Sequence, residues 1–502
     1  MKSSQRLLKN VLAGGIGTAL SGVLQFAAVI ILTRKLGLRD FGIYSVLATL
    51  AFLLSRFADL GTSAVLLRDL AIAPESADDL FSAALTLSWC IVAAITLTAY
   101  AVALGVTAAP ELRRVIELMA ISGLIQYPCA CYASLMRARE DNELEAIGSL
   151  LHKLGLLALL CFCFAMRAQL QGVAIAHLLA SSTQLVYCAW VTRKKYFSPS
   201  RRFDFGTWAY LLRESLPFGS AAVVRLAGEQ GELTVLAWIA GLSAVGLYSA
   251  VYRITIGLRF VPQAMVIAVF PAYSRAGSRV RDSGSDAPEF QRIYEFGIRI
   301  LTIISVPLSL IIFLSSRPLV TVVLGPSYLP AVPALKVLSI AAGVFFVSSP
   351  YPYLLTALGE QSFLLISSAV AATLRILLVL ILARMFGIVG ASWAVLIVES
   401  CLLLAWVSHL ARKHFYLDIR DMLRKTLPAA VAMSVPFLLC QSQSRPTPAL
   451  PAAILISSMI YCAVLLKTRA FSEEEMRLAA DALKFIRPFV AQWSGRRTPQ
   501  AG

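Results

Sequence analysis

The chain has 502 residues, of which 58% are hydrophobic and only 15% are charged, and its mean hydropathy is +0.75. A soluble domain carries about 25% charged residues, so this composition excludes a soluble protein and indicates an integral membrane protein. Lys and Arg number 45 against 28 Asp and Glu, which gives a net charge of +17. In a membrane protein such an excess is expected to set topology, with contact to membrane lipids as a by-product, and no nucleic-acid partner is expected.

The apolar runs, bounded by charges, Pro or Gly, predict an all-α protein with about 14 transmembrane helices. The expected spans lie at about residues 10–32, 41–60, 81–104, 115–135, 144–165, 170–191, 214–239, 245–271, 295–315, 332–357, 362–384, 387–409, 426–440 and 449–466. The last two runs are short or interrupted by Pro, so twelve spans is the competing count. Lys and Arg outside the spans concentrate in alternate segments, which predicts that both termini are cytoplasmic.

The segments between spans are too short to hold a catalytic domain on the outer side, where the longest is Ser316 to Ala331. We therefore expect a protein that is not an enzyme. The nine cysteines all fall in apolar stretches and lack metal-ligand spacing, so no metal and no cofactor are expected. After the last span, Ser472 and Glu475 form a capping box, which predicts an amphipathic helix on the inner surface.

An internal repeat is visible at a constant offset of 204 residues. LLKN at Leu7 matches LLRE at Leu211, and GLRDFGIYS from Gly37 matches GLSAVGLYS from Gly241. A weaker match pairs LQGVAIA with IVGASWA at the start of spans 6 and 12. Two six-span units that cross in the same direction are predicted, related by a pseudo-twofold axis along the membrane normal. The expected division is a first bundle, a basic linker, a second bundle, two extra helices and a cytoplasmic tail, at residues 1–195, 196–213, 214–411, 412–466 and 467–502.

Two stretches of the first unit resemble signatures of a known group of transporters. They are TRKLGLRDFGIYS, Thr33 to Ser45, and RFADLGTSAVLLRDLA, Arg56 to Ala71. With the basic N-terminus and the Gly-rich first span, they resemble the multidrug/oligosaccharidyl-lipid/polysaccharide exporter superfamily, and within it the bacterial polysaccharide-biosynthesis flippases of O-antigen type. The resemblance covers most of the chain and implies an alternating-access transporter in the bacterial cytoplasmic membrane. It also places Arg56 and Asp59 at the inner mouth of the transport path.

Several charges fall inside spans, where each costs roughly 2.5 to 3.5 kcal/mol unless it faces a bundle interior or a wet cavity. In span 7, Arg225, Glu229 and Glu232 share one helical face. In span 8, helical spacing predicts a second polar stripe that consists of Tyr248, Tyr252, Thr255, Arg259 and Gln263. Arg253 lies on a different face of the same span. Arg guanidinium groups match phosphate oxygens and Tyr rings suit sugars, so these two faces predict a cavity for a lipid diphosphate-linked sugar. A structural bridge between Arg225 and Glu229 explains that pair equally well.

Other intramembrane charges are weaker candidates for the same cavity. Arg375 and Glu399 lie on consecutive spans near mid-membrane, where they form either a site or a mutual structural bridge. Lys153 is deep enough in span 5 to face a cavity and shallow enough to reach the interface. For Arg56 and Asp59, the alternative to a role in the cavity is a structural pair at the end of the helix.

These features predict a flippase that moves a polyprenyl diphosphate-linked oligosaccharide across the cytoplasmic membrane for surface polysaccharide synthesis. Arg225 and Arg259 would meet the diphosphate, with Arg56, Lys153, Arg375, Gln263 and the tyrosines lining the cavity. Glu229 or Glu232, with Asp59 and Glu399 as further candidates, would carry a coupling proton or sodium ion. The alternatives are a drug exporter of the same superfamily, and a non-transporting scaffold for a complex that contains the polysaccharide polymerase. A membrane glycosyltransferase is disfavoured by the short loops.

Overall fold

A computed structural model describes residues 3–73, 77–106, 109–283, 287–441 and 450–468, leaving out some side chains, those of 3–19 and 220–229 among them. Within these ranges the chain is helical and contains no strand. The α-helices are α1 Ser3–Asp59, α2 Thr62–Ile72, α3 Ala77–Val106, α4 Pro110–Leu124, α5 Gln126–Ala138, α6 Asn142–Ala165, α7 Leu170–Lys195, α8 Phe205–Ala240, α9 Leu242–Leu258, α10 Phe260–Ser283, α11 Ala287–Leu319, α12 Val332–Ser348, α13 Tyr351–Ala357, α14 Gln361–Arg412, α15 Ile419–Gln441 and α16 Leu450–Lys467. The amphipathic tail predicted after residue 468 lies outside the described residues.

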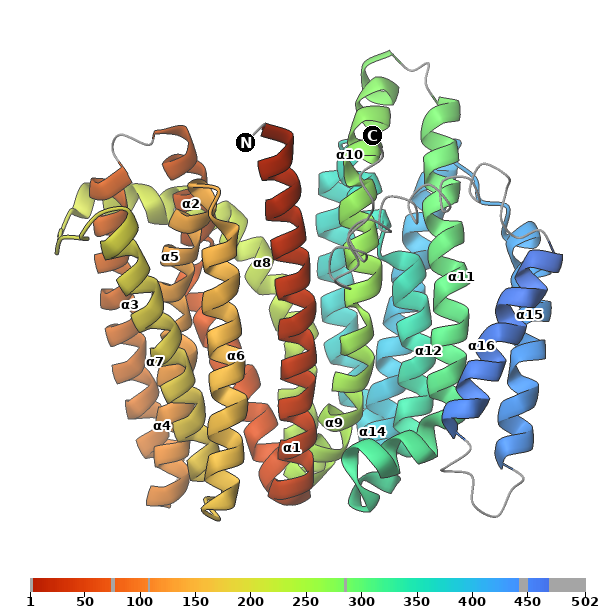
Figure 1. Cartoon of the computed structure of the whole chain (residues 1–502), viewed down its shortest axis with the longest axis horizontal. Coiled ribbons are helices and arrows are strands. Elements are labelled where there is room, and N and C mark those ends of the chain that lie inside the picture. Colours follow the sequence, from red (N-terminus) through yellow and green to blue (C-terminus); the bar gives the residue numbers. More distant parts are fainter. Residues whose placement is uncertain (1–2, 74–76, 107–108, 284–286, 442–449, 469–502) are drawn as a thin grey trace, which may run out of the picture.

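Two helices are too long to cross a membrane once. α1 has 57 residues and α14 has 52, which at about 1.5 Å per residue far exceeds a hydrocarbon layer of about 30 Å. Each is interrupted by a glycine in a non-helical conformation, Gly37 (φ 76°, ψ 169°) in α1 and Gly387 (φ 57°, ψ −135°) in α14. In Figure 1, α1 descends from the upper end of the molecule and folds back at the lower end. By length and composition, ten helical segments in the described ranges can cross a membrane, these two among them.

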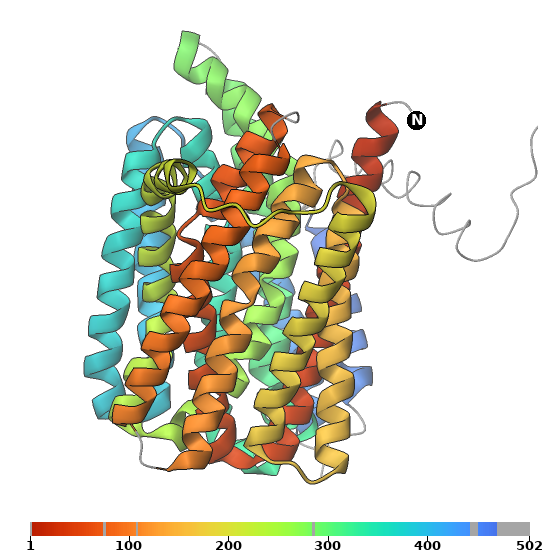
Figure 2. The same ribbon diagram turned by 90° about the vertical axis from the view of Figure 1, so that its left-hand side faces the viewer.

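The helices form two groups on either side of a central set (Figure 1). Helices α2 to α7 gather on one side and α10 to α16 on the other, with α1, α8 and α9 between them. The first turns of α8 lie across the N-terminal group and are seen end-on in Figure 2. There Arg68 of α2 donates to the Tyr210 hydroxyl at 3.2 Å and contacts Glu214 at 3.5 Å. Beyond this point α8 packs against α14, so one continuous helix joins both groups.

The two groups are connected where α1, which packs on α4 and α6, crosses α9, which packs on α12. Gly42 and Gly246 lie at this crossing, because a Cβ added to Gly42 would come 1.8 Å from the Leu242 oxygen and one added to Gly246 would come 2.1 Å from the Leu38 oxygen. Only glycine permits so close an approach of two backbones. Ser249 donates a hydrogen bond to Ser45 at 2.8 Å. The two serines are 204 residues apart, as are the two glycines.

The segment expected as the longest outer loop, Ser316 to Ala331, is helical almost throughout. α11 continues to Leu319, and a π-helix (η2, Val320–Leu324) and a 3-10 helix (η3, Pro326–Ala331) follow. Gly325, with φ 108°, separates the two short helices. Tyr328 and Ala331 are buried and hold this segment against the bundle.

The first and last turns of α14 are joined by charged side chains, at the end away from Gly387. Glu360, just before α14, accepts a hydrogen bond from Lys413 just after it, and lies 3.2 Å from His409. The bond from Lys413 lowers the pKa of the Glu360 carboxyl below its ordinary value. The two arms of α14 are therefore tied together at this end, while Gly387 joins them at the other.

Candidate functional site

Four charges, three of them buried and one partly exposed, meet between α8, the end of α9 and the two arms of α14. Arg375 donates to Glu399 at 2.8 Å, and Arg259 lies 3.8 Å from the same carboxylate. Glu232 completes the group, with its Oε2 4.0 Å from Arg375. We call Glu232, Arg259, Arg375 and Glu399 the four-charge network. Its two positive and two negative charges balance, as expected for ions removed from water.

The tyrosines of α9 belong to this network. Tyr248 donates to Glu232 Oε1 at 3.3 Å, and its ring stacks on that of Tyr252 with centroids 5.5 Å apart. Both tyrosines are buried, and Glu232 Oε2 accepts no hydrogen bond. Arg259 lies over the Phe345 ring at 4.1 Å and is partly exposed, and Gln263 in α10 is exposed. In this conformation, the predicted sugar-binding tyrosines therefore pack against a carboxylate.

A second group of polar side chains lies between α1, α6 and α7 of the first half and α9 of the second. Lys153 of α6 donates to the Gln25 side chain of α1 at 2.6 Å, and the positive charge of Arg253 of α9 is close enough to act on that of Lys153. Arg253 also lies 5.8 Å from the centre of the Tyr44 ring, whose hydroxyl is 3.2 Å from His177. Beside them, His152 Nδ1 is buried without a hydrogen-bond partner. We call Gln25, Tyr44, His152, Lys153, His177 and Arg253 the cation cluster.

The cation cluster differs from the four-charge network in its charge balance. Among the side chains that the structure describes, no carboxylate forms an ion pair or hydrogen bond with any member of the cluster. Lys153 and Arg253 are thus two cations within the membrane-spanning region that no acid among the described side chains balances. Uncompensated buried charges are costly, so such a pair favours an anion from outside the protein.

The remaining predicted residues occupy other places. The side chains of Arg225 and Glu229 lie outside the described residues. Arg56 is exposed and lies 5.2 Å from the centre of the Phe52 ring. Asp59 is buried at the junction of α1 and α2, where it accepts hydrogen bonds from the Ser63 amide at 2.8 Å and the Ser63 hydroxyl at 2.7 Å. The carboxylate therefore caps the first turn of α2.

A substitution at Asp59 is expected to separate this capping role from the predicted ion coupling. Asp59→Ala removes the cap and should lower the free energy of unfolding by about 0.5 to 2 kcal/mol, whereas Asp59→Asn keeps a cap of similar quality. Thermal unfolding of the purified variants measures the difference. Equal melting of the Ala and Asn variants would contradict the capping role. An Asn variant with unchanged stability but transport independent of any ion gradient would support the predicted coupling.

Because the charges of the four-charge network balance, removing one of them should lower stability and removing a pair of opposite sign should not. Arg375→Met leaves the Glu399 carboxylate without its hydrogen-bonded partner and should cost about 3 to 5 kcal/mol of stability. Arg375→Met combined with Glu399→Met removes one charge of each sign, and most of that loss should be recovered. A double-mutant cycle on thermal or denaturant unfolding checks both statements. Additive losses in the double variant would show that the two residues do not act as a pair.

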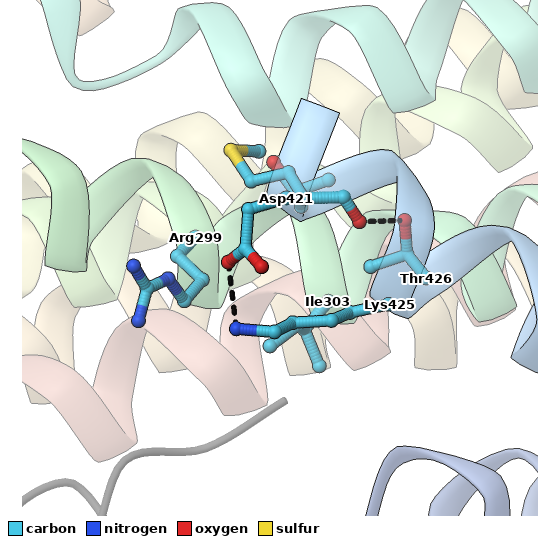
Figure 3. A pocket seen from close by; sticks show the side chains of 7 residues that line it. Arg299, Ile303, Asp421, Lys425 and Thr426 are labelled. Atoms are coloured by element: carbon cyan, nitrogen blue, oxygen red, sulfur yellow. Dashed lines mark hydrogen bonds and ion pairs between the residues drawn. The ribbon is translucent and has the colours of Figure 1, made fainter. Parts of the chain in front are cut away.

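A small hollow between α11 and α15 contains a further pair of charges (Figure 3). Its walls are Arg299, Thr302, Ile303, Asp421, Met422, Lys425 and Thr426. Lys425 bonds to Asp421 at 2.6 Å within the first turns of α15. Together with the Tyr461 hydroxyl, which donates to the Ile303 carbonyl of α11 at 2.9 Å, this contact region attaches the last two helices to α11.

Of the cation cluster, only Lys153 was predicted as a cavity residue. Helical periodicity missed Arg253, because its partners come from α1, α6 and α7 and not from its own helix. A signal was present in the sequence. No acidic residue occurs between Gly148 and Lys195, although that stretch contains His152, Lys153 and His177 in apolar surroundings. Positive and titratable groups without a nearby acid indicate a cluster whose counter-charge comes from elsewhere.

The fold is that of the MOP superfamily of transporters. Over 90% of this chain and 98% of the other, the structure is similar to a lipid II flippase, MurJ, in its inward closed conformation, with a TM-score of 0.73 and 13% identity. An inward-facing multidrug resistance MATE family transporter matches 78% of this chain and 94% of its own, with a TM-score of 0.65 and 17% identity. A MOP superfamily transporter from Pyrococcus furiosus matches with a TM-score of 0.54 and 16% identity over 81% and 95% of the two chains.

The comparison of the sequence with protein-family models shows the family. Residues 7–276, more than half of the chain, match the model of the polysaccharide biosynthesis protein family, and the protein belongs to that family. A search of the curated proteins found no match. The resemblance stated from the motifs at Thr33 and Arg56 is thereby confirmed for the family and the superfamily fold.

Proposed function

We propose that the protein is a flippase that carries a polyprenyl diphosphate-linked oligosaccharide across the bacterial cytoplasmic membrane for surface polysaccharide synthesis. Its family is that of polysaccharide biosynthesis proteins, and its fold is shared with a lipid II flippase. The observation that carries the proposal is the cation cluster. A diphosphate supplies the negative charge that Lys153 and Arg253 lack among the described side chains, and guanidinium and ammonium groups are its usual partners.

This assignment moves the proposed diphosphate contact from Arg259 to the cation cluster. Arg259 and Arg375 share Glu399, and Arg375 also faces Glu232, so the two positive charges are already balanced by two carboxylates. Lys153, predicted as a cavity residue, keeps that role and is joined by Arg253. Arg225 remains a candidate from the sequence alone, and Tyr248, Tyr252, Gln263 and Arg56 remain candidates for the rest of the path.

We further propose two six-span halves followed by two helices, with fourteen crossings and both termini in the cytoplasm. The arms of α1 and α14 on either side of Gly37 and Gly387 each provide two crossings. Gly37 and Gly241 support the repeat, since they are 204 residues apart and share a backbone conformation, φ 76° and ψ 169° against φ 80° and ψ 171°. Under this topology the lower end of Figure 1 is the outer side. The domain limits at residues 195, 213, 411 and 466 follow from it.

Ion coupling is the second part of the proposal. Glu232 is 1% exposed and one of its oxygens accepts no hydrogen bond, which makes it the best described candidate for binding a proton or sodium ion. Glu399 is engaged by two arginines, and the Glu229 side chain is outside the described residues. Transport that is indifferent to both imposed gradients would remove this part and leave the substrate assignment in place.

Proteoliposomes that contain a labelled polyprenyl diphosphate oligosaccharide test the function. Protein-dependent movement of the label to the opposite leaflet is the expected result, and an unlabelled lipid diphosphate should compete with it. Export of organic cations in the absence of glycan-lipid movement would favour the drug exporter that the MATE-like fold also permits. Folded protein that moves neither, but is required for polysaccharide assembly in cells, would favour the scaffold.

A further inference from the structure

The lower end of the molecule is closed by a contact between side chain and main chain. Arg34, three residues before Gly37, belongs to the first half, whereas η2 belongs to the second. The Arg34 guanidinium donates to the Val323 carbonyl at 3.1 Å through Nε and to the Val322 carbonyl through Nη2. Both donors therefore reach across the boundary between the halves.

The acceptors are unusual partners for an arginine. The last carbonyls of a helix have no partner within it and carry a partial negative charge, which a cation stabilises. Val322 and Val323 are such residues, because η2 ends at Leu324 and Gly325 turns the chain away with φ 108°. Arg34 thus satisfies orphan carbonyls that the short π-helix creates. A neutral carbonyl binds a guanidinium less strongly than a carboxylate does, so the contact is suited to repeated breaking and remaking.

A second contact places the same segment against the first half. Phe41 of α1 meets Tyr328 of η3 edge to face, with ring centroids 6.2 Å apart. Both rings are fully buried, so the aromatic contact supplies close packing, whereas Arg34 is exposed. The exposed polar contact is therefore the part that can change while the packed ring pair still fixes the register of the two halves.

We propose that Arg34 is a clasp that holds the outer side of the transporter shut and that must release η2 before the outer side opens. The proposal rests on the proposed alternating-access function for its place in a transport cycle. It assigns the π-helix a purpose, since its last turn presents two adjacent carbonyls to one guanidinium. No acidic side chain takes part in this contact, because both acceptors of Arg34 are main-chain carbonyls.

Distance measurement between spin labels tests the clasp directly. Cysteines at Glu111 and Ser327, both exposed and on opposite halves, are labelled in a full-length protein whose nine native cysteines are replaced. Arg34→Ala should raise the ratio of long to short distances by about tenfold, because two charge-assisted hydrogen bonds of the closed state are lost. Arg34→Lys keeps the positive charge but loses the two-pronged guanidinium, so its distance ratio should lie between those of the parent protein and Arg34→Ala. Arg39→Ala is the matched control, since it removes an exposed guanidinium five residues away.

The outcomes separate the clasp from the transport function. An Arg34→Ala distribution identical to that of the parent and of Arg39→Ala would overturn the clasp, whatever the protein carries. A lengthened distance in Arg34→Ala, in a protein that moves no glycan lipid, would uphold the clasp and reject the proposed substrate. Because Arg34 is exposed, the variant is expected to fold, and an unchanged melting temperature in detergent confirms that it has.

Discussion

Joining Ser45 to Ser249 by a disulfide is expected to abolish transport. The two hydroxyl oxygens are 2.8 Å apart at the crossing of α1 and α9, so a Ser45→Cys/Ser249→Cys pair needs only a small approach to reach a bond of about 2 Å. Alternating access requires the outer parts of the two halves to separate, and a covalent link at this crossing forbids it. Oxidation of the double variant should stop glycan-lipid flux, and reduction should restore it.

The controls for this experiment are the two single cysteine variants in the same background without native cysteines. Each single variant should transport equally under oxidising and reducing conditions. Full transport by a protein shown to be cross-linked would mean that the α1–α9 crossing stays closed throughout the cycle. That result would make the crossing a fixed pivot and would require a different opening on the outer side.

Removing either cation of the cation cluster is expected to raise stability and to lower transport. Lys153→Met replaces an ammonium group that no carboxylate in the described part of the chain balances, so the free energy of unfolding should increase. The same change removes a charge-assisted bond to the diphosphate, which should reduce flux at limiting substrate by at least about tenfold. Arg253→Met is expected to behave in the same way. Thermal unfolding and proteoliposome flux, measured on the same preparations, report the two effects.

The opposite signs of the two effects distinguish a binding group from a structural one. Arg375→Met serves as the comparison, because its charge is balanced by Glu399 and its removal should lower stability. A loss of stability in Lys153→Met would indicate that its bond to Gln25 matters more than its uncompensated charge. Unchanged flux in both Lys153→Met and Arg253→Met would exclude the cluster as the diphosphate site.

Much of the architecture could be predicted because it depends on local patterns. Apolar runs of span length mark the helices, and Gly37 and Gly241, which the proposed repeat aligns, have the same unusual backbone conformation. The motif at Thr33 to Ser45 led to the correct family. Arg375 and Glu399 were predicted as either a site or a mutual bridge, and the structure contains the bridge, with Arg259 and Glu232 added.

What could not be predicted depends on contacts between distant segments. Helical periodicity assigns a side chain to a face of its own helix but does not say which helix packs there, so Arg253 was set apart from the site. The same limit applies to Arg34, whose partners are main-chain carbonyls 288 and 289 residues away. Such acceptors have no signature in the sequence, because every residue carries one.

The helix α8 contacts both groups of helices. Its first turns are bound to α2 through Arg68, Tyr210 and Glu214, and its later turns pack along α14. Its backbone also touches the α1–α2 corner, since a Cβ on Gly219 would lie 1.8 Å from the Leu60 oxygen. α8 therefore contacts both groups of helices, so any displacement of one group relative to the other has to bend α8 or break one set of these contacts.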